Sequence, residues 1–478
     1  MYNNNILTLT DSYKTSHWKQ YPKGTTKVYS YLESRGGKFD NTMFYGLQYF
    51  IKQYLSGQVV NEEKIQKAKK FWDSHLGPNH FNETGWRHIL DNHNGQLPVR
   101  IKAVPEGTVV KTGNVLVTVE NTDPQLPWLT NYLESILLQV WYPITVGTLS
   151  REVKKNLINY LQKTTTYNPE EINGIVSFML HDFGFRGVSS VESSGLGGSS
   201  HIINFMGTDT VSGILFAQEF YNTENTLAFS IPASEHSTIT SWGESFEVKA
   251  MENMLDAYPT GLVACVSDSF DIIRACRDYW GTDLRDKILS RDGRLVIRPD
   301  SGDPVQTLKQ IFHILWDKFG GVINEKGFKV IDPHVRVIQG DGVNYESISD
   351  ICDMMIEEGF SIENIAFGMG GALLQKVDRD TQKFAFKCSS ITINGEEVDV
   401  RKNPIEINEK GERVQSFKKS KAGRLKLENG QTIEHSRDEV GDELVEVFVN
   451  GKVTKEWTFE EVRERAKIKN ENYELESI

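Results

Sequence analysis

The chain has 478 residues and a formal net charge of −12, with 38% hydrophobic and 25% charged residues. This length exceeds one ordinary hydrophobic core and predicts one large domain with one or two smaller ones. The acidic balance argues against a nucleic-acid partner, and no apolar run approaches the roughly 20 residues that span a bilayer.

The amino-terminal residues show neither the basic region nor the apolar core of a signal peptide. The four cysteines are scattered without a metal-like or redox-like spacing, which favours structural thiols in a reducing compartment. We therefore expect a cytoplasmic protein without a membrane partner.

Residues 1–150 are expected to form the first part of a smaller mixed α+β domain, together with several helices. Residues 61–93 have a helical pattern, and alternating valines within residues 97–122 predict a small antiparallel sheet. The stretch from Leu126 to Leu161 is predicted to be largely helical, with an interruption or kink at Pro143.

Residues 151–384 are expected to form a barrel-like domain, because short apolar runs recur there and most are followed by a helical pattern. The predicted strands are Ser177–Leu180, Ile202–Phe205, Ala228–Ile231, Leu262–Val266, Leu295–Ile297, Val335–Ile338 and Ile365–Phe367. This repetition predicts parallel strands joined by right-handed crossovers. Seven such strands suit an irregular (β/α) barrel, and a doubly wound open sheet is the alternative.

Polar residues follow the predicted strands. They are Asp182, Asp209, His236, Asp268, Asp300, Asp341 and the glycine run of residues 368–371. A single Asp in such a position is usually a helix N-cap. However, the loops that follow the strands of a parallel barrel share one face, which carries the active site. Five aspartates in register along one chain therefore predict a common site.

The segment Arg298-Pro299-Asp300 follows a strand of the buried type. Arg298 can fork onto a phosphate or a carboxylate, and Asp300 can accept from a sugar hydroxyl or hold a metal through water. The alternative is a structural Arg–Asp pair with a helix cap. Two glycine turns, at residues 339–342 and 368–371, favour phosphate binding by backbone N–H groups. Cationic residues near these turns in sequence support this interpretation: Arg298, Arg336, Arg379 and Lys387.

Residues 385–478 are expected to add strands, a basic loop and a helix that pack back on the amino-terminal domain. Phe384–Ile393 and Leu444–Val449 read as strands, and Thr458 to Lys467 as a capped helix with capping-box spacing. The basic segment between the strands includes Lys402 and Lys418. It is either a solvated loop or a phosphate-binding one.

Motifs over nearly the whole chain resemble those of the nicotinamide phosphoribosyltransferases, which are type II phosphoribosyltransferases. The segments that carry the resemblance are residues 11–14, 44–49, 180–190, 207–211, 235–238, 266–269, 298–302, 337–342 and 373–376. The resemblance implies an irregular (β/α) barrel with a smaller mixed α+β domain built from both chain ends. It also implies an enzyme of NAD biosynthesis that joins nicotinamide to phosphoribosyl pyrophosphate, releasing nicotinamide mononucleotide and pyrophosphate.

The family's Mg²⁺, its co-substrate ATP and its homodimer, with active sites at the subunit interface, are implied as well. In that pattern Phe183 and the second subunit's Tyr13 enclose the pyridine ring, Asp209 accepts from the carboxamide, and Arg298 lies against the nicotinamide. The remaining positions implied to bind substrate or phosphate are Ser230, Asp300, Asp341, Gly340, Gly370, Gly371, Arg186, Arg379, Lys387, Lys402 and Lys418. Asp268 and Asp300 are implied to lie near magnesium-bound pyrophosphate. Phe185, Met369 and Ala385 depart from the family pattern.

From the residues alone, we interpret His236 as a structural histidine at the start of a helix, capped by its neighbours. The resemblance instead implies that ATP phosphorylates this histidine to couple its energy to the reaction. Two alternatives to the implied function stay open: a nicotinate phosphoribosyltransferase and a non-catalytic nucleotide-binding barrel. A carboxylate at Asp209 favours the nicotinamide enzyme, because it attracts an amide N–H and repels the carboxylate of nicotinate.

Overall fold

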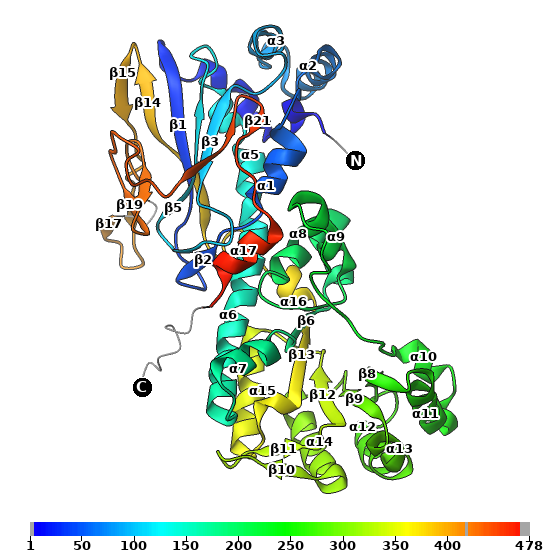
Figure 1. Ribbon diagram of the computed structural model, residues 1–478. Coiled ribbons are helices and arrows are strands. Elements are labelled where there is room, and N and C mark those ends of the chain that lie inside the picture. Colours follow the sequence, from blue (N-terminus) through cyan, green and yellow to red (C-terminus); the bar gives the residue numbers. More distant parts are fainter. Residues whose placement is uncertain (1–3, 416–418, 469–478) are drawn as a thin grey trace. The chain divides into compact units, whose positions relative to one another are not determined.

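The computed structural model describes residues 4–415 and 419–468, which form two compact units (Figure 1). The first unit takes the chain up to Thr148 and residues 218–223 and 378–466, and the second takes residues 149–217 and 224–377. Within the described residues, no helix combines the length and the apolar character needed to cross a bilayer. All four cysteines lie in described segments and are free thiols.

The first unit is built on a seven-stranded antiparallel sheet to which both halves of the chain contribute. Its strands, in spatial order, are β15 (Glu396–Asp399), β14 (Phe384–Ile393), β1 (Thr25–Ser34), β5 (Val115–Asn121), β3 (Val99–Ala103), β20 (Val445–Val449) and β21 (Lys452–Val453). The central pairing joins β1 to β14 along their length, from Thr25↔Ile393 to Ser34↔Phe384. The predicted small antiparallel sheet is thus the centre of a larger one.

Helices and short hairpins complete the first unit. The helices are α1 (Leu47–Phe50), α2 (Glu62–Leu76), α3 (Glu83–Asn92), α4 (Leu129–Tyr132), α5 (Glu134–Leu137) and α17 (Phe459–Ala466). β2 (Asn41–Met43) pairs with β4 (Val109–Lys111) as a two-stranded sheet, and the hairpins are β16 (Ile405–Ile407) with β17 (Arg413–Gln415) and β18 (Lys426–Glu428) with β19 (Gln431–Ile433). The predicted capping box is present, because Glu461 N donates to Thr458 Oγ1 and Thr458 N donates to a Glu461 carboxylate oxygen.

The predicted interruption between Leu126 and Leu161 lies before Pro143. The chain forms α4, α5 and a turn of 3₁₀ helix before α6 (Trp141–Thr164) begins. Pro143 falls in the first turn of α6, where a missing N–H costs no intrahelical hydrogen bond. The helix therefore starts near the proline and is not kinked in its interior by it.

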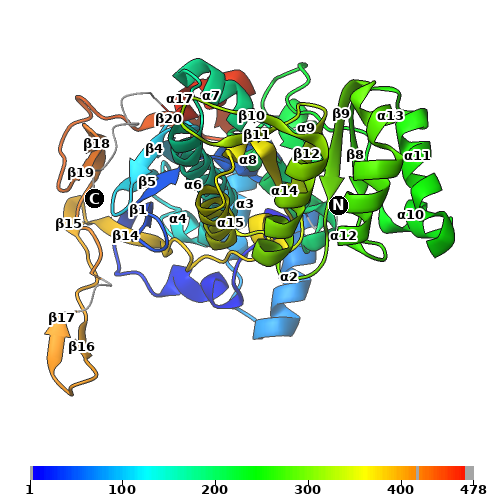
Figure 2. The same ribbon diagram turned by 90° about the horizontal axis from the view of Figure 1, so that it is seen from below.

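The second unit is built on a six-stranded parallel sheet. Its strands, in spatial order, are β7 (Gly207–Thr208), β6 (Leu180–Asp182), β13 (Ile365–Met369), β12 (Val335–Gln339), β9 (Asp292–Arg298) and β8 (Thr260–Val266). Its helices include α7 (Pro169–Val176), α8 (Val191–His201), α11 (Glu247–Ala257), α14 (Pro304–Phe319) and α15 (Tyr345–Glu357). Figures 1 and 2 show α11 beside β8, which places a helix against the outer edge strand.

Residues 228–234 close this sheet into an irregular barrel. Phe229 makes a parallel bridge to Gly207 at one edge, and Ala233 makes one to Ala264 at the other edge. Four backbone hydrogen bonds support the closure, including Phe229 N to Met206 O at 2.7 Å and Ser234 N to Ala264 O at 3.0 Å. The barrel prediction is therefore confirmed, although the predicted strand Ala228–Ile231 is reduced to bridges. Inside the barrel, Ala264, Val296 and Ile338 form a small apolar core.

Two strand predictions in the second unit are wrong in position. Ile202–Phe205 continues the end of α8 as a helical turn, since Ile202 N donates to Gly198 O and Phe205 N to His201 O. Ser177–Leu180 is mostly a turn after α7, and β6 starts only at Leu180. Both runs are short and apolar, and such runs can be a strand or a buried helix end with the same periodicity. The other four predicted strands lie within β8, β9, β12 and β13.

Candidate functional site

The predicted polar residues gather at the carboxyl ends of the parallel strands. Asp182 ends β6, Asp209 follows β7, Asp268 follows β8, Asp300 follows β9, and Asp341 follows β12. His236 is the first residue of α10 (His236–Thr240), directly after the segment that closes the barrel. These residues thus share one face of the barrel, as expected for an active site.

A chain of polar contacts joins three of these residues to Arg298. Arg298 Nη2 donates to Asp300 Oδ1 at 2.9 Å. Asp300 Oδ2 lies 4.0 Å from His236 Nδ1, and His236 Nε2 lies 3.0 Å from Asp268 Oδ1. Because a carboxylate only accepts, the Nε2 proton of His236 points to Asp268. In the neutral form of the ring, the second nitrogen, Nδ1, then carries the lone pair, on a side chain that is about half exposed.

Phe183 and Arg298 form one wall of this site. The Arg298 guanidinium lies 5.7 Å from the centre of the Phe183 ring, which is within cation–π range. Phe183 N donates to Met369 O at 3.0 Å, so the backbone below the ring is fixed to β13. Arg298 is partly buried and already neutralised by Asp300. This pair can hold a flat, partly charged ring.

Asp209 and Ser230 form the opposite wall. Ser230 Oγ donates a short hydrogen bond to Asp209 Oδ1, and Asp209 N donates to Asp182 O at 3.0 Å. The Asp209 side chain is therefore oriented by its neighbours, while the residue remains exposed to the cavity. An exposed, oriented carboxylate suits a hydrogen-bond donor on a bound molecule.

A cavity of 440 Å³ runs from these two walls into the barrel. Phe183, Asp209, Ser230 and Arg298 line its upper end, and Ala264, Val296, Ile338 and Ala366 line its middle. A more open cleft of 750 Å³ shares Phe183, Asp209 and Arg298 and extends to Arg186. An apolar slot beside an open polar cleft fits a small ring joined to a larger polar group.

The glycine turns lie at the same strand ends. Gly340 follows β12, and an added Cβ there would lie 3.4 Å from the Phe183 ring. Gly370 follows β13, with Gly371 as the first residue of α16 (Gly371–Leu374), and the main chain of Phe183 lies 3.4 Å from a Cβ added to Gly370. Arg336, by contrast, lies at the amino-terminal end of β12, where it donates to three backbone carbonyls. Its expected part in phosphate binding is therefore not supported.

Four further predicted residues lie in the first unit and are described there. They are Tyr13, Arg379, Lys387 and Lys402. The Tyr13 ring is 60% exposed, which is unusual for a large aromatic side chain. Burial lowers the pKa of Lys387; Glu134 opposes this, while Arg35, Lys402 and Lys14 add to it. Lys418 lies outside the described residues.

Comparisons with known proteins agree with this geometry. Residues 178–451 match the nicotinate phosphoribosyltransferase (NAPRTase) family, and residues 5–101 match the nicotinamide phosphoribosyltransferase N-terminal domain. The chain belongs to the nicotinate phosphoribosyltransferase family. It is therefore an enzyme, a phosphoribosyltransferase, and the resemblance seen in its motifs is confirmed.

Two relatives with known names align with almost the whole length of this chain. A Xanthomonas campestris protein named nicotinamide phosphoribosyltransferase is 50% identical over 97% of this chain and 98% of its own length. An Acinetobacter baylyi protein of the same name is 31% identical over 96% of this chain and 97% of its own.

Solved structures support the type II phosphoribosyltransferase fold. Nicotinate-nucleotide pyrophosphorylase from Pyrococcus furiosus matches with a TM-score of 0.55 at 14% sequence identity. The match covers 98% of this chain and 96% of the pyrophosphorylase chain. Human nicotinic acid phosphoribosyltransferase matches with a TM-score of 0.50 at 16% sequence identity. The match covers 96% of this chain and 92% of the human chain.

Gly368 packs against Phe183, a role that the sequence did not predict, because its glycine run was expected only to bind phosphate. A Cβ at this position in β13 would lie 1.9 Å from Phe183 Cε2, which is far closer than two non-bonded carbon atoms can approach. Only glycine therefore lets the Phe183 ring lie flat against the strand. The glycine run itself was the available signal, but its contact with Phe183 depends on the pairing of β13 with β6.

We expect Gly368→Ala to displace the Phe183 ring and to lower kcat/KM for the ring substrate by about 100-fold, as misplacements near 1 Å do. Steady-state kinetics of the purified variant measures this loss. Gly174→Ala is the matched control, because Gly174 lies in α7 with nothing within 4 Å of an added Cβ. The control should keep full activity and gain up to about 1 kcal/mol of stability. Equal activities of the two variants would contradict the packing role of Gly368.

Asp182 is buried beneath the site, and the pKa of its carboxyl is raised far above the ordinary value. Burial raises the pKa of its carboxyl to about 7, and the charge of Asp209 adds to this although Gly184 N donates to Asp182 Oδ1 at 2.7 Å. Between the ordinary pKa of 3.8 and about 7, the folded protein binds one proton more than the unfolded chain. The free energy of unfolding therefore falls as pH rises through this window.

We expect Asp182→Asn to remove this pH-dependent cost. Asparagine keeps an acceptor for Gly184 N–H but cannot ionise. The variant's stability advantage should grow from pH 5 to pH 7 and then level off at no more than about 4 kcal/mol. Denaturant unfolding at several pH values measures it. Asp303→Asn, at the exposed N-cap of α14, should show no such trend. A flat difference for Asp182→Asn would show that its carboxyl is ionised throughout.

Proposed function

We propose that the chain transfers the phosphoribosyl group of 5-phosphoribosyl 1-pyrophosphate to the ring nitrogen of nicotinamide, in NAD biosynthesis. The products are nicotinamide mononucleotide and pyrophosphate. The observation that carries the choice of nicotinamide is the oriented carboxylate of Asp209 on the wall of the ring-sized cavity. The match of residues 5–101 to a nicotinamide phosphoribosyltransferase domain and the names of two near-full-length relatives support the same choice.

The pyridine ring would lie between Phe183 and Asp209, with its carboxamide toward Asp209. The Asp209 carboxylate accepts from the amide N–H, and Arg298 lies beside the ring. These contacts fix the direction of the ring nitrogen's lone pair. Orientation of this kind can supply a large part of the rate enhancement of a two-substrate reaction.

The ribose and phosphates would occupy the polar cleft outside the ring slot. Asp300 and Asp341, which follow β9 and β12, would accept from ribose hydroxyls, and Arg186 lines the open part of the cleft. The backbone of Gly340, Gly370 and Gly371 permits close approach of a phosphate, because a side chain there would fill that space or meet Phe183.

The residues present fit a magnesium ion at the pyrophosphate end of the site. The carboxylates of Asp268 and Asp300 both lie next to the imidazole of His236. Carboxylate oxygens are the kind of ligand that Mg²⁺ prefers. When bound, Mg²⁺ neutralises pyrophosphate oxygens and so makes pyrophosphate a better leaving group. Asp268 and Asp300 would hold it directly or through water.

The chemistry needs no protein nucleophile and no proton transfer at the ring. The bond between ribose C1 and the pyrophosphate oxygen breaks, and pyrophosphate leaves with the electron pair. The lone pair of the nicotinamide ring nitrogen forms the new bond to C1, which gives a pyridinium product. Positive charge develops at C1 on the way, as in glycoside cleavage, and the carboxylates of Asp300 and Asp341 lie at that end of the site.

We propose further that ATP phosphorylates His236 at Nδ1. Asp268 holds the Nε2 proton, which leaves the Nδ1 lone pair free to attack the γ-phosphorus of ATP. A bond from Nδ1 to phosphorus forms while the bond from the γ-phosphorus to the bridging oxygen breaks, and ADP leaves. The phosphorylated histidine would then lie beside the pyrophosphate end of the site and couple hydrolysis to product formation.

We expect His236→Ala to lose all stimulation by ATP while keeping basal synthesis of nicotinamide mononucleotide. Product formation with and without ATP, together with an acid-labile, base-stable phosphate on the wild-type protein, measures this. His313→Ala is the matched control, because His313 also pairs with a carboxylate, Glu358, on outer helices of the barrel. Full ATP stimulation of His236→Ala would refute the coupling role.

We also propose a homodimer in which the partner subunit's Tyr13, Arg379 and Lys387 complete each active site. The exposed Tyr13 ring and the crowded cations around Lys387 are surfaces that lack an obvious role within one chain. Lys402 and Lys418 would meet nucleotide or pyrophosphate phosphates. If this is right, mixed dimers of Tyr13→Ala and Asp300→Asn chains recover activity that neither homodimer shows. No recovery on subunit exchange would contradict a shared site.

The proposed function is tested by incubating the protein with nicotinamide, phosphoribosyl pyrophosphate and Mg²⁺. We expect nicotinamide mononucleotide and pyrophosphate in equal amounts, and no turnover when any one of the three is omitted. A protein that binds both substrates but releases no pyrophosphate would instead be a nucleotide-binding barrel without this activity.

A further inference from the structure

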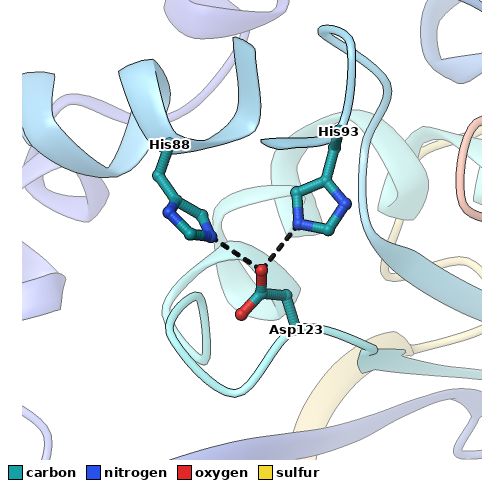
Figure 3. A group of neighbouring side chains, drawn as sticks. All are labelled: His88, His93 and Asp123. Carbon is teal, nitrogen blue, oxygen red and sulfur yellow. Dashed lines mark hydrogen bonds and ion pairs between the residues drawn. The ribbon is translucent and has the colours of Figure 1, made fainter. Parts of the chain in front are cut away.

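A cluster of two histidines and one aspartate lies in the first unit, apart from every residue assigned to the reaction. His88 lies in α3, His93 is the residue that ends it, and Asp123 lies in the turn after β5. Both imidazoles point at one carboxylate oxygen (Figure 3): His88 Nε2 lies 2.8 Å and His93 Nε2 lies 2.6 Å from Asp123 Oδ2. All three ligand atoms lie within 4.8 Å of one another.

The backbone and the second carboxylate oxygen of Asp123 are already held by other groups. Gln125 N donates to Asp123 Oδ1 at 2.8 Å, and Asn121 Nδ2 donates to Asp123 O at 2.7 Å. Oδ2 is therefore the carboxylate oxygen that faces the two imidazole nitrogens.

This donor set is one that divalent transition metals bind. Two imidazole nitrogens and a carboxylate oxygen occur in zinc sites that keep a further position for water. In a tetrahedral zinc site with bonds of about 2.0–2.1 Å, neighbouring ligand atoms lie roughly 3.3 Å apart. The two nitrogen–oxygen distances, 2.8 and 2.6 Å, therefore have to lengthen by about 0.5 and 0.7 Å to admit such an ion. The three side chains are between 12% and 27% exposed, so an ion can reach them from solvent.

We propose that His88, His93 and Asp123 form a binding site for a divalent transition-metal ion of the zinc class. Mg²⁺ is disfavoured there, because it prefers oxygen ligands. The bound ion replaces the two N–H···O hydrogen bonds by three metal–ligand bonds. It thereby ties α3 to the turn after β5.

Asn92 controls how easily His88 becomes a ligand. Its Nδ2 lies 3.1 Å from His88 Nδ1 and 3.2 Å from His88 O. In this arrangement Nδ1 accepts, so the proton of a neutral His88 is on Nε2. Metal binding at Nε2 moves that proton to Nδ1, which then needs an acceptor. Asn92 has to turn its amide oxygen toward the ring, whereas a carboxylate at residue 92 would accept the proton directly.

The test is equilibrium dialysis of the tag-free, full-length protein against Zn²⁺ in excess Mg²⁺, with Co²⁺ as a visible-absorption probe of the same site. We expect one zinc ion per chain at saturation for the wild type. Asp123→Asn and His88→Gln should lose that ion, and His435→Gln should keep it. His435 is the matched control, because its Nδ1 lies 2.5 Å from Asp399 Oδ2 but it belongs to no such three-ligand group among the described residues.

Asn92→Asp supplies an opposite readout that does not depend on damaging the cluster. We expect it to bind zinc about tenfold more tightly than the wild type. No saturable zinc in the wild type overturns the proposal. So does zinc that stays bound in both Asp123→Asn and His88→Gln, because the ion would then lie elsewhere, for example at His236. Unchanged affinity in Asn92→Asp would also count against His88 as a ligand.

Discussion

Replacing Asp209 by asparagine is expected to lower the preference for nicotinamide over nicotinate by about 10–100-fold in the ratio of kcat/KM values. The carboxylate of Asp209 accepts from an amide N–H and repels a carboxylate on the ring. Asparagine removes the charge, keeps one acceptor and adds a donor that a carboxylate substrate can use. The change should therefore come mainly from faster turnover of nicotinate.

Ser230→Ala separates the charge of Asp209 from its orientation. Ser230 donates to Asp209, so its removal loosens the carboxylate without neutralising it. We expect lower rates with both ring substrates and an almost unchanged ratio between them. If Asp209→Asn left the ratio as it is in the wild type, the basis of selectivity would have to lie elsewhere in the cavity.

Asp300→Asn is expected to lower kcat/KM for phosphoribosyl pyrophosphate by about 100- to 1000-fold, a loss of roughly 3–4 kcal/mol of transition-state stabilisation. The Asp300 carboxylate neutralises Arg298 and lies 4.0 Å from His236, and we propose that it binds the ribose and magnesium. Asparagine keeps the shape but not the charge. The kinetics should be measured over a range of Mg²⁺ concentrations, because weaker magnesium binding predicts partial recovery at high Mg²⁺.

Asp350→Asn is the control for this variant. Asp350 is an exposed residue of α15, on the outer layer of the barrel, and its replacement should leave the kinetics unchanged. A variant at Asp300 that kept more than a tenth of the wild-type kcat/KM would show that its carboxylate is not a central element of the site.

The sequence predicted the parallel strands where an apolar run stood between clear turns. β8, β9, β12 and β13 contain their predicted segments, because Gly, Asp or Ser ends each run and a helix follows. It failed at Ile202–Phe205, where tertiary packing buries the last turn of α8 with the same apolar pattern as a strand. Local periodicity carries no information about which buried element a short run joins.

The sequence predicted Ala228–Ile231 as a regular strand, whereas residues 228–234 close the barrel through isolated bridges. Pro232 cannot donate to a neighbouring strand, so the segment makes single bridges to β7 and β8 where a regular strand would make a ladder. Counting strand ends placed Asp300 correctly, after β9. Asp209 and His236 lie on the same face, but Asp209 follows β7 and not the predicted Ile202–Phe205, and His236 follows a bridged segment and not a regular strand. The role of Gly368 depended on a contact with Phe183 across two paired strands, which no spacing along the chain reveals.

In the first unit, the pairing of strands that are distant in sequence could not be predicted from local sequence patterns. The sequence predicted β14 as a strand but not β1, and their antiparallel pairing joins residues more than 300 positions apart. The cluster of His88, His93 and Asp123 depends on the same long-range order, since α3 and the turn after β5 meet only once the sheet has formed.

The most direct test of the proposed function is the ratio of kcat/KM values for nicotinamide and nicotinate with the wild-type protein at saturating phosphoribosyl pyrophosphate and Mg²⁺. The oriented carboxylate of Asp209 predicts a ratio of at least about 100 in favour of nicotinamide. A ratio near one, or a preference for nicotinate, would contradict the assignment of nicotinamide as the substrate.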